Sequence, residues 1–276
     1  MKPGRRRAPW PGLAEAELAV GIREGRFLGR FDATALREEL ARERILSALA
    51  ARGYAEVRIE TSVSAGEHRL RLRFPGGRAS LVDLRLQEAT LLVEEPLLKA
   101  RGGTLLSVLA NTWLSLQDPR GRFTVERPRL PGQRYPGLGL TGAFYALTTR
   151  WAREWGKDAL LATPQYYHNA VFYARGLSFL SPADQGRFLA LRRDLGSLPV
   201  AAASAAVAEG RVRELGSGSV LRWPPAPMAA GLTEPLAEYL GSRDYEREVE
   251  ALARALRFAL RGRPERLRRA RPGEAG

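Results

Sequence analysis

The sequence predicts a mixed α/β protein, with a mixed central sheet flanked by helices, on three observations. Residues 57–93 hold short runs in which apolar and polar side chains alternate, as they do along strands. Apolar residues recur at helical spacing both before and after these runs. A short apolar segment at 159–162 lies between two helical patterns, as a buried strand does in this class. The chain has 276 residues and 45% hydrophobic content, so it can bury a sizeable core.

The first expected element is an amphipathic helix. Asp32 or Thr34 supplies the side-chain oxygen that caps its first turn, and Gly53 ends it. Three strands of an antiparallel meander follow, at 57–59, 70–74 and 81–86. The glycines at positions 76 and 77 form the turn between the second and third of these strands.

Two apolar runs follow the meander. Residues 90–93 either extend its third strand or add a strand of their own. Residues 105–116 are apolar almost throughout, so their period does not separate a helix from a strand. We expect a helix or loop there that leads into a strand at 113–116. The proline-rich segment 118–136 is then a long loop and the best candidate for a domain joint.

The second half begins with a clear helix. Its single apolar stripe is formed by Leu140, Phe144, Leu147, Trp151 and Trp155, and the glycine at position 156 stops it. The two tryptophans are therefore expected in the core. The remaining elements are a strand at 159–162, helices at 166–173 and 182–195, a hairpin around 216–218, an extended segment at 223–227 and a final helix over 243–261 that Ser242 caps.

These elements divide the chain into four parts. They are a basic disordered tail at 1–10, an N-terminal helix and β-meander part at 11–117, a ligand-binding α/β part at 118–230, and a C-terminal amphipathic helix with a basic tail at 231–276. The second part is a β-rich extension of the third.

The composition excludes several kinds of site. Because the chain has no cysteine, it has no disulfide framework, no thiolate metal site and no cysteine nucleophile. Its two histidines, His68 and His168, are too few for an ordinary metal centre, and we expect no metal. His68 stands among arginines and is expected to be a solvated strand position. The small-residue run 200–208 is too short to span a membrane, and residues 1–10 lack the apolar segment of a signal peptide, so we expect a cytoplasmic protein.

More than half of the net charge of +14 lies at the two ends of the chain. Residues 1–10 carry +4, and residues 261–276 carry six arginines against two glutamates, another +4. Basic tails of this kind are usually solvated, and they also attract nucleic acid without sequence specificity. Nucleic acid is therefore a candidate partner through the tails and not the expected main ligand.

A glycine-rich segment that opens directly into the helix at 140–155 is the strongest candidate binding site. It reads Gln-Arg-Tyr-Pro-Gly-Leu-Gly over 133–139. Glycines let the backbone approach a ligand closely, and the helix behind them presents free N–H groups and the positive end of its dipole. This arrangement suits a pyrophosphate, to which Arg134 would add a charge-assisted contact. The alternative is a turn that only leads into a core helix.

Segment 133–139, taken with Asn-Ala-Val-Phe-Tyr-Ala-Arg-Gly-Leu-Ser-Phe at 169–179, resembles the GNAT superfamily of acyl-CoA-dependent N-acetyltransferases. Members carry an R/Q-x-x-G-x-G/A loop that wraps the coenzyme A pyrophosphate. A helix, a strand and a second helix with an N-x-x-A-x-x-x-Y-x-x-x-G-F-like ending follow. Arg134 to Gly139 fills the loop pattern, and Asn169, Tyr173 and Gly176 fall in the later one. The resemblance covers about residues 113–179.

The resemblance implies a GNAT-like fold in which the strand at 159–162 runs beside the preceding strand. It also implies acetyl-CoA or another acyl-CoA as co-substrate and an amine as acceptor. By the resemblance, main-chain amides near Gly137, Leu138 and Gly139 hold the pyrophosphate of coenzyme A. Asn169 then contacts the pantetheine arm or acyl region, and Tyr173 protonates the departing thiolate.

An N-acyltransferase also needs a base that accepts a proton from its amine substrate. His168 is a candidate, because a neutral imidazole titrates near pH 6.5. Asp118 and Glu126 are carboxylate candidates near the end of the strand expected at 113–116. The alternative for His168 is a structural hydrogen bond within the cluster 166–168.

Other functions stay open beside the acyltransferase. The chain is either such an enzyme or a noncatalytic GNAT-like scaffold whose basic tails bind nucleic acid or a protein partner. The final helix is basic and amphipathic, as membrane-surface anchors are, but Glu246, Glu248 and Glu250 on its polar face favour ordinary packing. The acceptor amine, the acyl length and the oligomeric state do not follow from the sequence.

Overall fold

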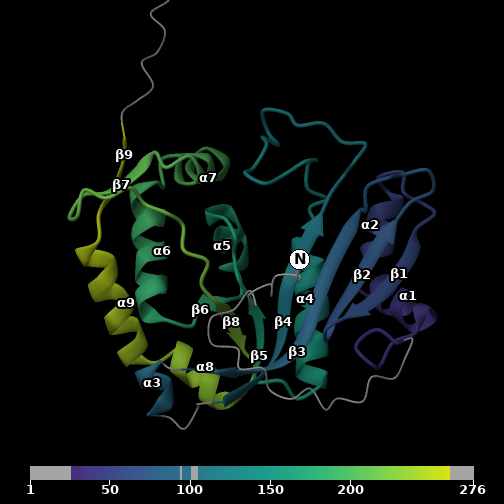
Figure 1. Cartoon of the computed structure of the whole chain (residues 1–276), viewed down its shortest axis with the longest axis horizontal. Coiled ribbons are helices and arrows are strands. Elements are labelled where there is room, and N and C mark those ends of the chain that lie inside the picture. Colours follow the sequence, from purple (N-terminus) through teal and green to yellow (C-terminus); the bar gives the residue numbers. More distant parts are fainter. Residues whose placement is uncertain (1–25, 94, 101–104, 262–276) are drawn as a thin grey trace, which may run out of the picture.

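A seven-stranded mixed sheet forms the centre of the protein (Figure 1). The computed structural model describes residues 26–93, 95–100 and 105–261. The strand order is β1-β2-β3-β4-β5-β8-β6, and β7 and β9 form a separate pair. The bounds are β1 (Arg58–Ser64), β2 (Glu67–Arg73), β3 (Val82–Leu92), β4 (Leu105–Leu116), β5 (Ala159–Ala162), β6 (Ser178–Phe179), β7 (Val212–Glu214), β8 (Met228–Gly231) and β9 (Phe258–Leu260). The mixed α/β class is confirmed.

Helices cover both faces of this sheet. Their bounds are α1 (Ala33–Arg42), α2 (Ile45–Ala50), α3 (Pro96–Lys99), α4 (Thr141–Glu154), α5 (Tyr167–Tyr173), α6 (Pro182–Asp194), α7 (Val200–Ala208), α8 (Glu234–Leu240) and α9 (Arg243–Ala255). Helices α1, α2 and α4 share a core with one face of β2 and β3, whereas α3, α8 and α9 share a core with the other face of β4 and β5. Within the described residues, no helix combines the length and the apolar character that a membrane crossing requires.

Strands β1 to β3 form the predicted antiparallel meander, and β4 extends it by one more antiparallel strand. In β2, Leu70 and Leu72 are fully buried, while Arg69 and the ends of the strand stay partly exposed. Arg69 donates to Asp83 of β3 over 2.8 Å, so the outer face carries cross-strand ion pairs. The turn before β3 contains Gly76 at a φ of 71°, as expected for a residue with no Cβ.

The expectation of a helix or loop before residue 113 was wrong, because all of 105–116 is the strand β4. Its neighbours are β3 and β5, so it is a central strand. Val108 and Ala110 are buried in one core, and Leu109 between them is buried in the other. A strand with both faces buried reads as a continuous apolar run, which hides the period of two. Residues 90–92, in contrast, extend β3 as one of the two alternatives stated.

The single helix expected after Asp32 is two helices, α1 and α2. Asp32 does cap the first, since its side chain accepts from the Ala35 N–H at 2.9 Å. Arg44 then adopts a left-handed conformation with a φ of 55°, and α2 begins at the next residue. This turn lets both short helices bury their apolar residues. In one straight helix, Ile45 and Leu49 would lie on the side opposite to Leu36 and Leu40.

The final helix is also shorter than expected and ends at Ala255. Residues 258–260 pair instead with β7. Arg193 of α6 donates to the carbonyls of Ala253 and Leu256 at 2.6 and 2.7 Å, which satisfies acceptors that the helix end leaves open. Ser242 caps the start of α9 as predicted.

His68 is not the solvated position that was expected. It is half-buried, its Nδ1 accepts from the Leu28 N–H at 2.8 Å, and the Phe27 ring lies edge-on to it. Burial lowers the pKa of His68 below its usual value. The partner lies 40 positions away in the chain, so the local pattern around His68 carries no sign of it.

The elements expected after residue 140 form α4, β5, α5 and α6, and the hairpin around 216–218 follows β7. Trp151 is fully buried and stacks on Trp155, as expected for core residues. Helices α7 and α8 were not foreseen. The boundary placed between residues 117 and 118 lies between β4 and β5, which are neighbours in one sheet. The tails at 1–10 and 262–276 lie outside the described residues.

Candidate functional site

The site lies where β4 and β5 separate. The two strands run parallel, and their pairing covers only 108–111 with 159–162. Strand β4 continues to Leu116, and among the described residues no strand pairs with its last part on the β5 side. At this point β4 also carries one extra residue, since Arg85 of β3 pairs with Trp113 and the next residue, Leu86, with Asn111. The extra residue is Thr112, and a bulge of this kind bends a strand and turns its side chains to new directions.

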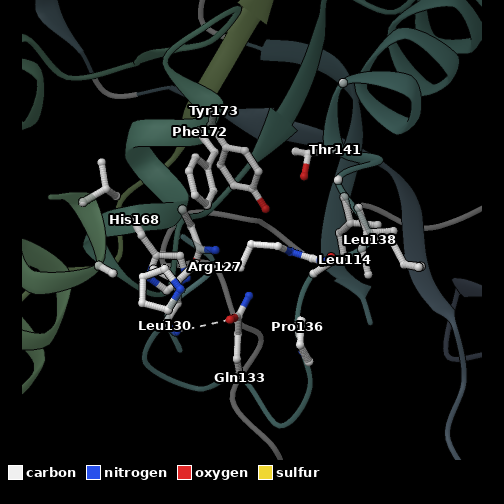
Figure 2. Close-up of a pocket in the computed structure, with 18 of the residues that line it drawn as sticks. Leu114, Arg127, Leu130, Gln133, Pro136, Leu138, Thr141, His168, Phe172 and Tyr173 are labelled. Atoms are coloured by element: carbon white, nitrogen blue, oxygen red, sulfur yellow. Dashed lines mark hydrogen bonds between the residues drawn. The ribbon is translucent and has the colours of Figure 1, made fainter. Parts of the chain in front are cut away.

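Two cavities meet at this opening. The larger has a volume of about 620 Å³ and is lined by the end of β4, the loop after it, the first turn of α4, α5 and the start of α7 (Figure 2). The smaller, of about 240 Å³, lies between residues 111–117 and the segment that follows β5, under loop residues 131–135. His168, Asn169 and Tyr173 line both cavities, so α5 forms part of the boundary between them.

The glycine-rich loop and the first turn of α4 form one wall of the larger cavity. Gly137, Leu138 and Gly139 line it, as do Thr141 and Gly142 of the helix. Leu140 provides no side-chain cap, and the amides of residues 141–143 have no hydrogen-bond partner in the described part of the chain. Free amides at a helix N-terminus attract anions, because the helix dipole adds a positive potential there.

Gly137 and Gly139 of the loop motif differ in why the position holds a glycine. Gly139 has a φ of 69°, which side chains rarely adopt. At Gly137 an added Cβ would meet its nearest neighbours at 3.8 Å, which is an ordinary contact. The backbone therefore requires glycine at 139, whereas at 137 the absence of a side chain keeps space free beside the cavity.

Arg134 does not line the larger cavity, although it is the first residue of the loop motif. It lines the smaller one, with its guanidinium 5.5 Å from the ring of Tyr135. The positive charge on the larger cavity comes from Arg127 and Arg175 instead. Arg127 reaches across the cavity and donates to the carbonyl of Gly137 at 2.6 Å (Figure 2).

Sequence reasoning missed both of these arginines. Arg127 stands in the irregular loop after β4, where no period or motif marks it. Arg175 lies inside the segment 169–179. Its position directly after α5 could have marked it as a candidate cavity residue.

Helix α5 carries three of the predicted site residues on one short element. The Oδ1 atom of Asn169 accepts from the Tyr166 N–H at 3.1 Å and thereby caps the helix. Gly176, just past the helix, lets Tyr145 of α4 approach, because an added Cβ would lie 2.4 Å from the Tyr145 hydroxyl. That hydroxyl donates to the Gly176 carbonyl at 2.9 Å, which links α5 to the helix behind the glycine-rich loop.

The hydroxyl of Tyr173 points into the larger cavity, on the side where Thr141 lies (Figure 2). Within the described residues this hydroxyl has no hydrogen-bond partner. Burial raises the pKa of Tyr173 to about 12. The side chain is protonated at neutral pH, as tyrosine ordinarily is, and can donate a hydrogen bond, while the raised pKa makes it a weaker acid than an exposed tyrosine.

His168 is buried, with 4% of its surface exposed, and its Nδ1 lies 2.8 Å from the Ser204 hydroxyl of α7. It stacks on Tyr166 at 5.5 Å, so it belongs to an aromatic cluster as well as to the cavity wall. Burial lowers the pKa of His168 to about 4, because the charged imidazolium loses its hydration. The imidazole is neutral at pH 7 but is a weaker proton acceptor than an exposed one.

Of the two carboxylate candidates, Glu126 lines the larger cavity and Asp118 lines neither cavity. The Oδ1 atom of Asp118 accepts from the Tyr54 hydroxyl at 2.6 Å and from the Gly121 N–H at 3.0 Å, so it closes the loop after β4. Backbone and Thr124 hydrogen bonds hold the pKa of Glu126 below its usual value. In the part of the chain that the structure describes, no three His, Asp or Glu residues gather as a metal site would require.

The structure thus brings Gly137, Leu138, Gly139, His168, Asn169 and Tyr173 to one cavity and places Arg134 on its neighbour. Comparison with protein-family models, with curated proteins and with solved structures finds no match to this chain.

Proposed function

We propose that the chain is a GNAT-like N-acyltransferase that moves an acetyl or longer acyl group from coenzyme A to an amine. One observation carries the proposal. The opening between β4 and β5 joins a cavity walled by uncapped helix amides to a second cavity, and Tyr173 lines both. Two cavities that share Tyr173 can hold two substrates beside one reaction point.

The larger cavity suits the coenzyme. Main-chain amides of Gly137, Gly139 and the first turn of α4 would bind the pyrophosphate, and Arg127 and Arg175 would balance its charge. The pantetheine arm would then extend toward Asn169 and Tyr173. The volume of about 620 Å³ is that of an ordinary small-molecule site and is large enough for most of this arm.

Tyr173 would serve as the acid of the reaction. As the amine nitrogen forms its bond to the acyl carbon, the carbon–sulfur bond breaks and the thiolate needs a proton. Tyr173 is protonated at neutral pH and its hydroxyl is free to give one. The amine loses a proton in the same reaction, and Glu126 is the carboxylate on this cavity that could pass it to solvent.

The proposal is tested by calorimetric titration of the full chain with acetyl-CoA and with coenzyme A. Gly137→Trp should fold normally and lose most of its affinity, because the indole would fill the space beside the loop. Gly137→Ala is the matched control, since its Cβ makes only ordinary contacts, and it should bind within a few-fold of the natural chain. Thermal unfolding of both variants checks that they fold.

No binding by the natural chain, or equal affinity in the folded Gly137→Trp variant, would overturn the assignment. The noncatalytic scaffold would then be the better hypothesis.

A further inference from the structure

The smaller cavity carries positive charge without any matching negative charge. Arg134 lines it, and no aspartate or glutamate of the described segments does. The guanidinium is exposed and lies over the ring of Tyr135, and it forms no ion pair with the described residues. Arg69, in contrast, is paired with Asp83 and has no such free charge. An unpaired arginine beside a cavity is therefore available for a ligand anion, and its planar guanidinium fits a carboxylate.

Two residues that line the same cavity each have a buried side-chain polar atom with no partner among the described residues. These atoms are Oδ1 of Asn111 and Oγ1 of Thr163. Asn111 pairs with Ala162 in the last step of the β4–β5 ladder, so Thr163 follows directly where the strands separate. Buried polar groups of folded proteins are nearly always hydrogen-bonded. Both atoms can accept hydrogen bonds, as the N–H donors of an amine require.

From these two features we propose that the smaller cavity binds the acceptor, and that the acceptor is a free amino acid or a similar small amine with a carboxylate. Its amine would lie at Asn111 and Thr163, toward Tyr173, and its carboxylate at Arg134. This inference rests on the proposed acyltransferase function. It excludes a plain alkylamine or a polycationic acceptor, because Arg134 would repel a second positive charge and no carboxylate among the lining residues is present to attract it.

Direct binding is measured by saturation-transfer NMR on the full chain, with and without saturating coenzyme A. The probes are the twenty common L-amino acids and, as a second set, their carboxamides. We expect one or more amino acids to bind and the matching carboxamide to bind at least ~10-fold more weakly, the loss expected for a charge-assisted hydrogen bond. With acetyl-CoA present, the amino acid that binds should also release free thiol.

The role of Arg134 is tested by Arg134→Gln. This variant should bind the amino acid at least ~10-fold more weakly than the natural chain does, and its affinity for the carboxamide should be unchanged. Arg122→Gln removes the same charge from the same loop at an exposed residue that lines neither cavity, so it should change nothing. Coenzyme affinity should stay the same in both variants.

The two unpartnered atoms are tested by Thr163→Val, which keeps the shape of the side chain. It should weaken amino-acid binding several-fold. Thr149→Val is the control, because Thr149 has an equally unpartnered buried hydroxyl in α4 that lines neither cavity. It should leave binding unchanged.

Binding of no amino acid, or equal binding of acids and carboxamides, would overturn the inference. So would an equal effect of Arg134→Gln and Arg122→Gln. If coenzyme A does not bind but amino acids bind through Arg134, the acyltransferase proposal fails while this site stands, so the two failures are distinguishable.

Discussion

Tyr173 is the residue on which the proposed chemistry most depends. Its pKa of about 12 keeps the hydroxyl protonated, and that hydroxyl faces the cavity without a partner among the described residues. We predict that Tyr173→Phe lowers kcat for acyl transfer by about 10²–10⁴, the usual contribution of general acid catalysis, with coenzyme affinity intact. Steady-state kinetics and calorimetry measure the two quantities.

The control is Tyr166→Phe, which removes a hydroxyl from the smaller cavity alone. If Tyr173→Phe leaves kcat unchanged and Tyr166→Phe lowers it strongly, the general acid is Tyr166 and not Tyr173.

His168 gives the protein a pH-dependent stability. Its pKa is about 4 in the folded chain and about 6.5 in an unfolded one, so the unfolded chain binds more protons between these values. Stability from this residue is therefore fully present above about pH 6.5 and falls as the pH drops toward 4, by at most about 1.4 kcal/mol per pH unit. Urea unfolding across this range should record the decline.

Because the chain has two histidines, ¹H NMR can follow each imidazole, with His68→Gln to assign the signals. A midpoint for His168 at or above 6.5 would contradict the prediction.

Most of the residues that the sequence patterns singled out line one cavity, whereas their roles stay predictions. The motif over 134–139 and the pair Asn169 and Tyr173 do line one cavity, apart from Arg134 and Tyr135. Which arginine faces which cavity depends on how the loop after β4 folds back, and no local pattern describes that. The hydrogen-bond partner of His168 could not be predicted from the local sequence either, because Ser204 lies 36 positions later on α7.

Among the elements, α6 and α9 depend on one glycine for their close approach. An added Cβ at Gly186 would lie 2.8 Å from Cβ of Leu252 and 2.9 Å from the Val249 carbonyl. We predict that Gly186→Ala lowers the free energy of unfolding by about 1–3 kcal/mol, as overpacking does. The contrast is Gly142→Ala in α4, where an added Cβ meets nothing within 4 Å and should stabilise the helix by up to about 1 kcal/mol.

Chemical denaturation of the two variants, beside the natural chain, measures both effects. A Gly186→Ala variant as stable as Gly142→Ala would mean that α9 shifts to make room, and that the packing of α9 on α6 is looser than described.

The period of apolar residues in the sequence identified the helices and strands that have one solvated side. It identified β2, α4 and α9, whose alternation or stripe reflects one buried face. It failed for β4, which is buried on both faces, and it did not assign a helix to α7, whose run of small residues has no polar side to mark its period.

For the whole molecule, we predict that the basic tails are not needed for folding. A chain of residues 11–261 should melt within a few degrees of the full chain, because the removed segments have little apolar content to bury. It keeps Arg261, whose N–H donates to the Arg211 carbonyl at 2.6 Å. Differential scanning calorimetry compares the two chains.

Any affinity of the full chain for nucleic acid should fall in the shortened chain and should weaken steeply with salt. Strong binding by the shortened chain that does not depend on salt would instead place a nucleic-acid site on the core and favour the scaffold hypothesis.

Neighbouring residues alone determined the type of most elements, the turns at Gly76 and Gly156, and the glycine-rich loop before α4. These features depend on backbone geometry within a few residues, so a single sequence contains them. The separation of β4 from β5, the bulge at Thr112 and the presence of Asn111 and Thr163 on one cavity exist only in the tertiary structure. They depend on strand register and on contacts between segments far apart in the chain, and the free energy of such contacts is shared among many side chains and leaves no local pattern.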